Sequence, residues 1–545
     1  MRAAVGCVPE PQLAFPGGGA EMSSQALQLV FAKNLIRQGR IGNALQLLQK
    51  IVAADGNLPE AHHVMAQAFS AQNKMGEALK SAERAHQLNP ANTDYAISLG
   101  GLYSNLKLYE YAFPLLQKAF EQYPEGFETN ECLARYYLEI ERGHQALPYF
   151  ERAIATAPDA VRRDETRLKL AECLSAINET ERANELLEDL AEDSGSTCQD
   201  SAKLLRGLGC TKPVDQQIVT DIEEMLKRPN LGKELKSQSL LALGRCRDLQ
   251  GSYDEAFAYW RQSRDLLGVK VHSRSALSTR NMQTRGIYSR TILDAAVPYG
   301  HQRNNLIFIA GMPRSGTTLT AQILAAHPQV SSIGETDRMN KLDIAYRRGY
   351  WHQAPETRML ENAKKGELRA QALETIRFFD SITDPERPWI VEKSPTNYES
   401  MGYIHLCFPQ ARFIHCRRHP ADNFISAYQL NMNRTHDYSY DQIAFAERYL
   451  AQEGIMNYWK QCFPGQILDV SYEELVSSPE DVIRRIVGFC GLEWNDDCLN
   501  FHQKKSTVRT YSTNQVRQPI FLTSLGRWKL YEKHLQPLLA ALKLQ

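Results

Sequence analysis

A glycine-rich segment, Gly311-Met312-Pro313-Arg314-Ser315-Gly316-Thr317-Thr318-Leu319, follows a short apolar run and precedes a stretch with helical patterning. A strand, a glycine loop and a helix in that order bind phosphate-like anions, because loop N–H groups and the positive end of the helix dipole point at the ligand. Arg314 adds a charged fork, and hydroxyl donors come from Ser315, Thr317 and Thr318. The segment therefore predicts an anion-binding loop.

This loop differs at one position from the loop that binds nucleoside triphosphates. It keeps the spacing G-x-x-x-x-G, but Thr317 stands where that loop has its lysine. The lysine and a magnesium ion normally neutralise the triphosphate. No acidic strand end elsewhere is typical of a magnesium ligand, so we expect an anion that is bound without a metal.

Two further charged side chains follow short apolar runs. Glu335 comes just after residues 330–333, and Lys393 comes just after residues 389–392. The carboxyl ends of parallel strands share one edge of a sheet, so both side chains should lie on the same edge as the glycine loop. A carboxylate there could accept a proton.

Four motifs in the expected order resemble those of sulfotransferases, especially the tyrosylprotein branch and the bacterial tetratricopeptide sulfotransferases. They are the loop at 311–319, Phe413–Pro420 followed by Ser426, Tyr472 within Val470–Leu475, and a closing region with Ser512–Pro519 and Gly526–Trp528. The resemblance covers about residues 304–540. It implies an α/β P-loop-like sulfotransferase domain with a central parallel sheet. It also implies 3′-phosphoadenosine 5′-phosphosulfate (PAPS) as the co-substrate, with no metal.

The resemblance also implies roles for single residues. In the tyrosylprotein branch the general base is a glutamate followed by threonine, which matches Glu335. Other branches use a histidine, and three histidines compete for that role: His327, His415 and His419. The family's catalytic lysine matches Lys393, which would donate to the bridging or leaving oxygen. Arg314 would stabilise the leaving oxygen, and Ser512 matches a serine that steadies the transition state, unless the alignment slips by one to Thr513. The implied PAPS-binding residues are Pro313, Arg314, Ser315, Gly316, Thr317, Thr318, Arg418, Ser426, Tyr472 and Arg527, with Arg418 and Ser426 at the 3′-phosphate.

The chain departs from the tyrosylprotein branch where that branch binds acidic peptides. Only one arginine, Arg338, closely follows the Glu-Thr pair, and Leu430 replaces a second arginine near the 3′-phosphate. The acceptor therefore stays open between a protein tyrosine, a carbohydrate and a small molecule. The segment 335–388 should include the acceptor pocket. Its aromatic and basic cluster fits either an acceptor or plain core packing: Tyr346, Arg347, Arg348, Tyr350, Trp351 and His352.

The elements that position these residues can be read from short apolar runs separated by amphipathic stretches. The runs are Leu306–Ala310, Val330–Ile333, Trp389–Glu392, Arg412–Cys416 and Gln466–Val470. Runs of this kind are typical of strands buried on both faces of a parallel sheet, with helices as crossovers. We place this domain at 304–545 and a connector at 271–303.

The first half of the chain repeats every 34 residues. Small residues recur at Ala44, Ala78, Ala112 and Ala146, and twelve residues earlier at Ala32, Ala66, Gly100 and Ala134. Large apolar residues follow at Leu35, Phe69, Tyr103 and Tyr137, and prolines close three units at Pro90, Pro124 and Pro158. Small residues let two helices approach closely, and proline ends the second helix. The pattern resembles tetratricopeptide repeats and predicts an all-α tetratricopeptide solenoid at 28–270, preceded by a flexible tail at 1–27.

The bulk composition limits the function classes. The chain has 545 residues, 43% of them hydrophobic, with 63 basic and 63 acidic side chains, so no global charge favours nucleic acid or an anionic membrane. Its eleven cysteines show no C-x-x-C pair, which fits reduced thiols in a cytoplasmic protein. Neither a membrane span nor a signal peptide is expected. Met22 is an alternative start to Met1.

Three functions follow as hypotheses. The first is a PAPS-dependent sulfotransferase with a hydroxyl-bearing acceptor, in which the repeats bind a protein or peptide partner or serve as a scaffold or homodimer contact. The second is a P-loop kinase or NTPase, against which Thr317 and the pair Arg418 and Ser426 argue. The third is a catalytically inactive repeat scaffold, against which the retention of Glu335, Lys393 and Arg314 argues.

Overall fold

The computed structural model describes residues 24–210, 212–268, 274–350, 361, 363–432, 434–504, 507–508, 510, 513 and 515–544. The chain forms two compact units, one up to Leu106 and one from Lys107 onward. The described part of the first unit is helical. Its helices are α1 (Ser24–Arg37), α2 (Ile41–Ala54), α3 (Pro59–Ala71), α4 (Met75–Leu88) and α5 (Thr93–Asn105).

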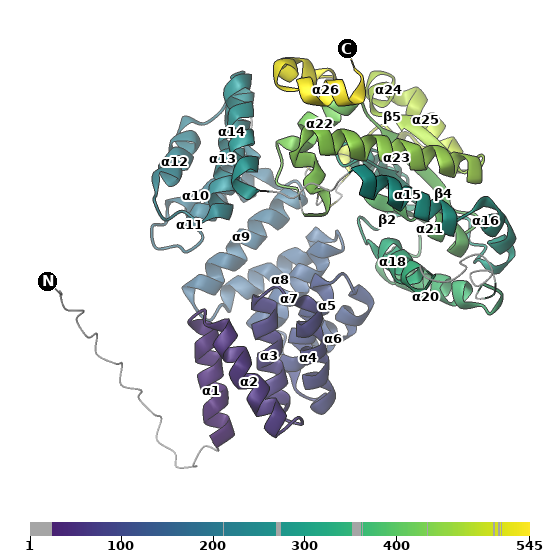
Figure 1. Ribbon diagram of the computed structural model, residues 1–545. Coiled ribbons are helices and arrows are strands. Elements are labelled where there is room, and N and C mark those ends of the chain that lie inside the picture. The colour runs from purple at the N-terminus through teal and green to yellow at the C-terminus, as the bar shows by residue number, and fades with distance from the viewer. Residues whose placement is uncertain are drawn as a thin grey trace. The chain divides into compact units, whose positions relative to one another are not determined.

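The second unit continues with more helices before its sheet begins (Figure 1). They are α6 (Tyr109–Gln122), α7 (Phe127–Glu139), α8 (Gly143–Ala155), α9 (Ala160–Ala176), α10 (Thr180–Glu192), α11 (Gln199–Gly209), α12 (Gln216–Lys227), α13 (Lys233–Gln250) and α14 (Tyr253–Leu267). A Cβ atom on Gly244 would lie 2.3 Å from the indole nitrogen of Trp260, which shows how closely α13 and α14 approach. The predicted tetratricopeptide-like region is confirmed as all-α.

The repeat residues identified in the sequence lie where the packing argument requires. Ala44, Ala78, Ala112 and Ala146 are each fully buried at helix contacts. Pro124 follows the end of α6 by two residues, as expected for a residue that cannot extend a helix. Small side chains at a 34-residue period therefore mark the places where neighbouring helices touch.

A five-stranded parallel sheet forms the centre of the C-terminal part. Its strands are β1 (Leu306–Gly311), β2 (Val330–Ser332), β3 (Trp389–Lys393), β4 (Arg412–Arg417) and β5 (Ile467–Ser471), in the order β2-β3-β1-β4-β5. The sequence placed all five strands to within one residue at each end. Strand β1 pairs with β3 on one side and β4 on the other, so the glycine loop leaves the middle of the sheet.

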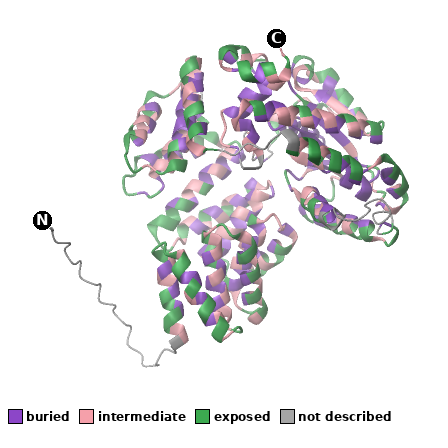
Figure 2. Cartoon of the chain, in the orientation of Figure 1, coloured by how far each residue is buried: buried purple, intermediate pink, exposed green. Residues whose placement is uncertain are grey.

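Helices cover both faces of the sheet. The surrounding elements are α15 (Arg274–Ile287), α16 (Arg290–Ala296), α17 (Thr317–Ala326), α18 (Arg338–Tyr350), α20 (Glu367–Ile382), η2 (Pro395–Glu399), α21 (Met401–Cys407), α22 (Pro420–Tyr428), α23 (Gln442–Cys462), α24 (Tyr472–Ser477), α25 (Pro479–Phe489), η6 (Arg527–His534) and α26 (Gln536–Leu542). Ile307 and Ile309 pack with α17 and α25, whereas Phe413 faces Phe463, just after α23. Figure 2 shows buried residues concentrated along the strands and inner helix faces.

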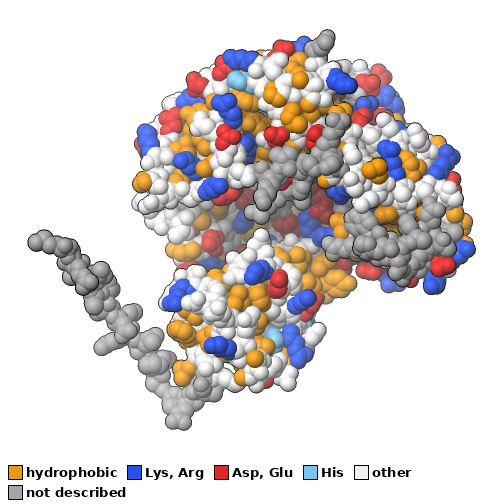
Figure 3. Space-filling view, viewed as in Figure 1, with side chains coloured by type: hydrophobic (Ala, Val, Ile, Leu, Met, Phe, Trp, Pro, Cys, Tyr) orange, Lys and Arg blue, Asp and Glu red, His pale blue; other side chains and the backbone are white. Residues whose placement is uncertain are grey.

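Surface character agrees with the balanced composition. On the face seen in Figure 3, basic and acidic side chains are interspersed without a large field of one sign. In the described part of the chain, none of the helices is both long and apolar enough to cross a membrane.

Candidate active site

The glycine loop joins the end of β1 to the first turn of α17. Arg314 and Gly316 both adopt left-handed backbone angles, with φ of 70° and 101°. A left-handed arginine is costly because its Cβ crowds the backbone, so the loop is held by its surroundings. The Asn423 side chain provides one such support, since its amide nitrogen donates to the Pro313 carbonyl over 2.7 Å.

The loop presents polar groups at the start of α17. The hydroxyl of Ser315 is buried and has no hydrogen-bond partner within the described protein. Thr317 and Thr318 are the first two residues of α17, and both are buried. Thr318 Oγ1 lies 3.4 Å from the hydroxyl of Thr510. An orphaned hydroxyl beside the positive end of a helix suits an anionic ligand.

Two arginines meet at this loop. Arg314 donates from Nε to Ser426 Oγ over 3.1 Å and from Nη2 to Gln515 Oε1 over 2.6 Å. Arg418 donates to the Arg314 carbonyl over 3.1 Å and to the Ser524 carbonyl over 2.9 Å. The structure thus brings the predicted Arg314, which follows β1, next to Arg418 and Ser426, which lie more than 100 residues later, after β4 and in α22.

The electrostatics of this pair favour an anion. Burial and the nearby charge of Arg418 lower the pKa of Arg314 to about 10. Burial also lowers the pKa of Arg418, whose Nε has no hydrogen-bond partner within the described protein. Two guanidinium groups beside one loop create a site of positive potential. A phosphate-type anion would relieve both costs.

A cavity opens beside the two arginines. Tyr472 lies over Arg418, with the guanidinium carbon 4.5 Å from the ring centre. The residues that line the cavity are Arg314, Gly316, Leu319, Arg418, Tyr472, Val476, Phe501, Gln515, Val516, Gln518, Ile520 and Phe521. Apolar and aromatic walls next to cationic groups fit a ligand that combines a flat ring with anionic groups.

The predicted base and lysine form a pair at the neighbouring strand ends. The Lys393 ammonium group donates to the carboxylate of Glu335. The Lys393 side chain is only 3% exposed, whereas the Glu335 side chain is 39% exposed. Burial alone would lower the pKa of Lys393, but the carboxylates of Glu335 and Glu141 raise it above its ordinary value. An accessible carboxylate thus lies next to a buried cation that stays charged.

A second glutamate, missed by the sequence interpretation, lies behind this pair. Glu392 is 2% exposed, and its carboxylate accepts from the Thr336 N–H and hydroxyl, each over 3.2 Å, and from Asn397 Nδ2 over 2.6 Å. Burial raises its pKa to about 7. Because Thr336 directly follows Glu335, Glu392 fixes the segment that carries the candidate base.

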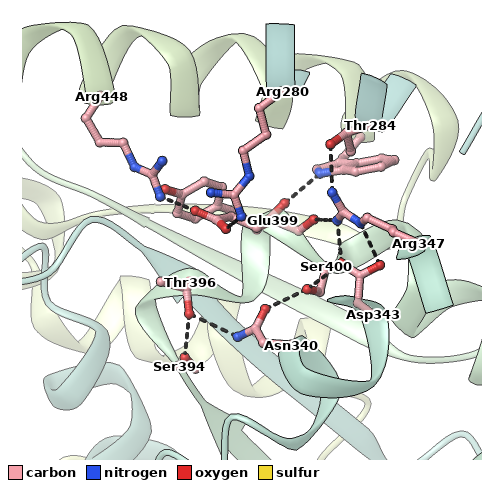
Figure 4. A network of polar contacts seen from close by, with 12 residues as sticks. Arg280, Thr284, Asn340, Asp343, Arg347, Ser394, Thr396, Glu399, Ser400 and Arg448 are labelled. Atoms are coloured by element: carbon pink, nitrogen blue, oxygen red, sulfur yellow. Dashed lines mark hydrogen bonds and ion pairs between the residues drawn. The ribbon is translucent and has the colours of Figure 1, made fainter. Parts of the chain in front are cut away.

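A polar network ties the Lys393 loop to α18 (Figure 4). Asn340 donates to Thr396 Oγ1 over 3.0 Å, and Ser400 donates to Asn340 over 2.6 Å and to Asp343 over 2.8 Å. Arg347 is buried against Asp343 and donates to Thr284 over 2.9 Å. The network holds the segments after Glu335 and Lys393 at a fixed separation.

Two residues of the predicted acceptor cluster belong to the core instead. Arg347 is fully engaged in the network above, and Tyr346 is buried with its ring centre 5.2 Å from that of Tyr403. Core packing, the second of the two interpretations, therefore holds for both. The side chains of Arg348 and Tyr350, and all of Trp351 and His352, lie outside the described residues.

One predicted site residue of the C-terminal region has its partner outside the cavity. Arg527 forms an ion pair with Asp248 of α13 and is not among the residues that line the cavity. Ser512 lies outside the described residues, whereas Thr513 donates to the Val508 carbonyl over 3.0 Å. Among the described residues, the C-terminal region lines the cavity with Gln515, Val516, Gln518, Ile520 and Phe521.

The three competing histidines all have structural partners. His327 lies 2.9 Å from the Glu493 carbonyl, His415 lies 2.8 Å from Asp469, and His419 stacks on Trp528 at 5.4 Å between ring centres. Glu335 remains the candidate base next to Lys393. Within the described residues, no group of three or more His, Cys, Asp or Glu side chains could hold a metal ion.

Comparisons with known proteins find similarity to sulfotransferases. Residues 306–496 match the sequence profile of the Sulfotransferase family. An uncharacterized protein of Aquifex aeolicus is 29% identical over 383 residues, covering 69% of this chain and 50% of that protein. Protein-tyrosine sulfotransferase 2 of Gallus gallus is 28% identical over 236 residues, covering 41% of this chain and 62% of that enzyme. The match thus spans half to under two thirds of these relatives.

Among solved structures, the sulfotransferase domain from the Synechococcus PCC 7002 olefin synthase is 21% identical. It covers 42% of this chain and 89% of that domain, with a TM-score of 0.32.

Proposed function

Because residues 306–496 form a sulfotransferase-family domain behind a helical repeat array, we propose that this chain transfers a sulfuryl group from PAPS to an acceptor hydroxyl. The meeting of Arg314 and Arg418 beside the glycine loop is the observation that carries the proposal. Arg314 donates to Ser426 and Gln515, and Arg418 donates to the carbonyl groups of Arg314 and Ser524. A 3′-phosphate and a 5′-phosphosulfate would place negative charge beside these two cations.

The proposed reaction is an in-line displacement at sulfur. The acceptor oxygen forms a bond to sulfur while the bond from sulfur to the 5′-phosphate oxygen breaks, which releases 3′-phosphoadenosine 5′-phosphate. Glu335 takes the acceptor proton, because its carboxylate is accessible at the strand edge. General-base help of this kind contributes about 10²–10⁴-fold.

Lys393 and Arg314 have the charge that the leaving oxygen needs. The carboxylates near Lys393 keep its pKa raised, so the side chain stays cationic in a buried position. Fixed cations in a region with little water stabilise developing negative charge better than mobile solvent does. Ser512 would add a hydrogen bond in the transition state, as the family resemblance implies.

For the acceptor, we propose the hydroxyl of a protein tyrosine, with the repeat array binding the substrate protein. The support is that several curated relatives are named protein-tyrosine sulfotransferases. Arg338 would not bind an acidic peptide as the arginines of the tyrosylprotein branch do, since it forms ion pairs with Glu110 and Glu374. Peptide recognition here would depend on other residues.

Calorimetric titration with 3′-phosphoadenosine 5′-phosphate, alongside ATP with magnesium, tests the donor class. We expect micromolar binding of the bisphosphate and little binding of ATP. Arg418→Ala should weaken binding by at least tenfold, because it removes a buried charge that faces the ligand. Arg417→Ala is the matched control, since Arg417 pairs with Glu453. A preference for ATP with magnesium would instead favour a kinase or NTPase.

Radiolabelled sulfate transfer to tyrosine peptides, glycans and small phenols tests the acceptor. Glu335→Gln should lower the transfer rate about 10²–10⁴-fold while leaving bisphosphate affinity unchanged. An unchanged rate would remove Glu335 as the base. Donor binding without transfer to any acceptor would favour an inactive scaffold.

A further inference from the structure

Left-handed residues recur in the turns of the helical array. Gly39, Asn73, Lys107, Glu141 and Asn178 have φ between 57° and 74°, and each lies in the turn between two consecutive helices. Their spacing follows the repeat, at 34 residues and then 37. Glycine and asparagine are the residues that tolerate this backbone region best, whereas lysine and glutamate pay a steric cost there.

Lys107 and Glu141, the two turn residues with the steric cost, contact the strand-end segments that carry Glu335 and Lys393. Lys107 donates from Nζ to the Glu335 carbonyl over 2.8 Å and to Asp337 Oδ2 over 3.0 Å. Asp337 is itself left-handed, with φ of 52°. Lys107 therefore grips the backbone of the candidate base and the residue two positions after it.

Glu141 acts from the next turn of the array. Its carboxylate lies against Gly334, since a Cβ atom on Gly334 would lie 2.6 Å from Glu141 Oε1. Gly334 is left-handed, with φ of 62°, and its carbonyl accepts from the Lys393 N–H over 3.0 Å. The negative charge of Glu141 also adds to that of Glu335 in raising the pKa of Lys393. One turn side chain thus touches the backbone link between the two catalytic segments.

We propose that Lys107 and Glu141 are positioning residues that hold Glu335 and Lys393 in place, so that the helical array supplies part of the active centre. Their role in catalysis rests on the proposed sulfuryl transfer. Their contacts with the segments that carry Glu335 and Lys393 do not depend on it. Strained backbone persists where the surrounding structure fixes it, and it is commonly found at functional sites. The other equivalent turns of the array have glycine or asparagine at this position. Lysine and glutamate replace them at the two turns that contact the strand ends.

Replacing Glu141 separates strain from function. Glu141→Gly and Glu141→Asn relieve the left-handed backbone, so the melting temperature should stay equal or rise. The same changes remove the carboxylate beside Gly334 and Lys393. We therefore expect kcat to fall roughly 10- to 100-fold with a smaller change in KM, because the reacting groups lose their alignment. A residue that only stabilises the fold would lose stability and activity together.

The titration of Lys393 gives a readout that needs neither donor nor acceptor. Cyanate carbamylates only the neutral amine, and peptide mass spectrometry follows the reaction at Lys393 as pH is raised. With Glu141→Gln, the onset of carbamylation should move to lower pH, because a carboxylate that favours the ammonium form has been removed. Lys107→Met should leave this onset nearly in place but lower kcat.

Two controls match these variants. Asn73→Gly alters the equivalent turn and Glu128→Gln removes an exposed charge from α7, and neither should move the Lys393 titration or kcat. An unmoved carbamylation onset in Glu141→Gln, together with unchanged kcat in Glu141→Gly, would overturn the inference. Absence of bisphosphate binding would count against the proposed function alone, since the carbamylation result does not depend on it.

Discussion

The guanidinium carbon of Arg418 lies 4.5 Å from the centre of the Tyr472 ring, and both residues are tied to Ser524. Arg418 donates to the Ser524 carbonyl over 2.9 Å, and the Tyr472 hydroxyl lies 2.6 Å from the Ser524 hydroxyl. The same ring limits the glycine loop, since a Cβ atom on Gly316 would lie 2.9 Å from it. One aromatic side chain therefore sets the position of a cation and the shape of the loop.

Substitutions of Tyr472 should separate its ring from its hydroxyl. Tyr472→Leu removes the face on which Arg418 rests, and bisphosphate affinity should fall about 3- to 30-fold, as expected for a cation–π contact worth about 0.5–2 kcal/mol. Tyr472→Phe keeps the ring and should change affinity less than about threefold. Calorimetry on both variants checks this. Equal losses in the two would place the effect in the hydroxyl.

Gly334→Ala should be more harmful than an alanine at another left-handed glycine. It incurs the backbone cost at φ of 62° and also drives a methyl group against Glu141. Gly366→Ala pays only the backbone cost, since φ there is 83° and, apart from its chain neighbours, no heavy atom of the described residues lies within 4 Å of the added Cβ. We expect a loss of about 1–2 kcal/mol for Gly366→Ala and a larger loss for Gly334→Ala, from chemical denaturation. Equal losses of stability in the two variants would mean that the Glu141 side chain moves away from the added methyl group without cost.

Glu392 should make stability depend on pH. Its pKa is about 7 in the folded protein, raised by burial from an ordinary value of 4.5. A raised folded pKa contributes stability that is fully present below pH 4.5 and is lost as pH rises through about 7. Relative to Glu392→Gln, the wild type should thus lose on the order of 3 kcal/mol between pH 5 and 8. Glu480→Gln, at an exposed position, is the control and should follow the wild type.

Substitution of Arg527 tests whether this residue binds the ligand, as the sequence predicts, or stabilises the fold, as the structure indicates. The family resemblance places it at PAPS, whereas the structure pairs it with Asp248, whose side chain is 4% exposed. The ion pair predicts that Arg527→Ala costs about 1–3 kcal/mol of stability and changes bisphosphate affinity less than about twofold. Asp248→Asn should lose a similar amount. A tenfold drop in affinity for Arg527→Ala alone would restore the sequence prediction.

The sequence predicts the fold closely because its signals are local. Continuous apolar runs located all five strands, and the glycine spacing located the turn between β1 and α17. Arg314, Arg418 and Ser426 could be grouped because the parallel topology brings strand ends together and the family motifs supply the pairing. Those residues do meet in the structure.

The remaining features depend on contacts between distant segments. Lys107 meets Glu335 across 228 positions, and nothing near either residue in sequence marks the other. Glu392 reads as an ordinary strand residue until Thr336 and Asn397 are placed around it. One feature of the sequence does point to these turns. Gly39 and Asn73 are residue types that favour a left-handed turn, and the 34-residue repeat places the same turn at Lys107 and Glu141.

The attachment of Arg517 to the end of α9 has a consequence for how the protein is made. Arg517 donates to the Ser175 carbonyl over 2.7 Å and also to the Ala176 carbonyl, more than 340 residues earlier in the chain. Domains form from the N-terminus during synthesis, so these carbonyl groups are in place long before Arg517 leaves the ribosome. Gln515 and Val516, which line the cavity, arrive with it. A nascent chain therefore carries folded repeats and an incomplete cavity until the segment around Arg517 emerges.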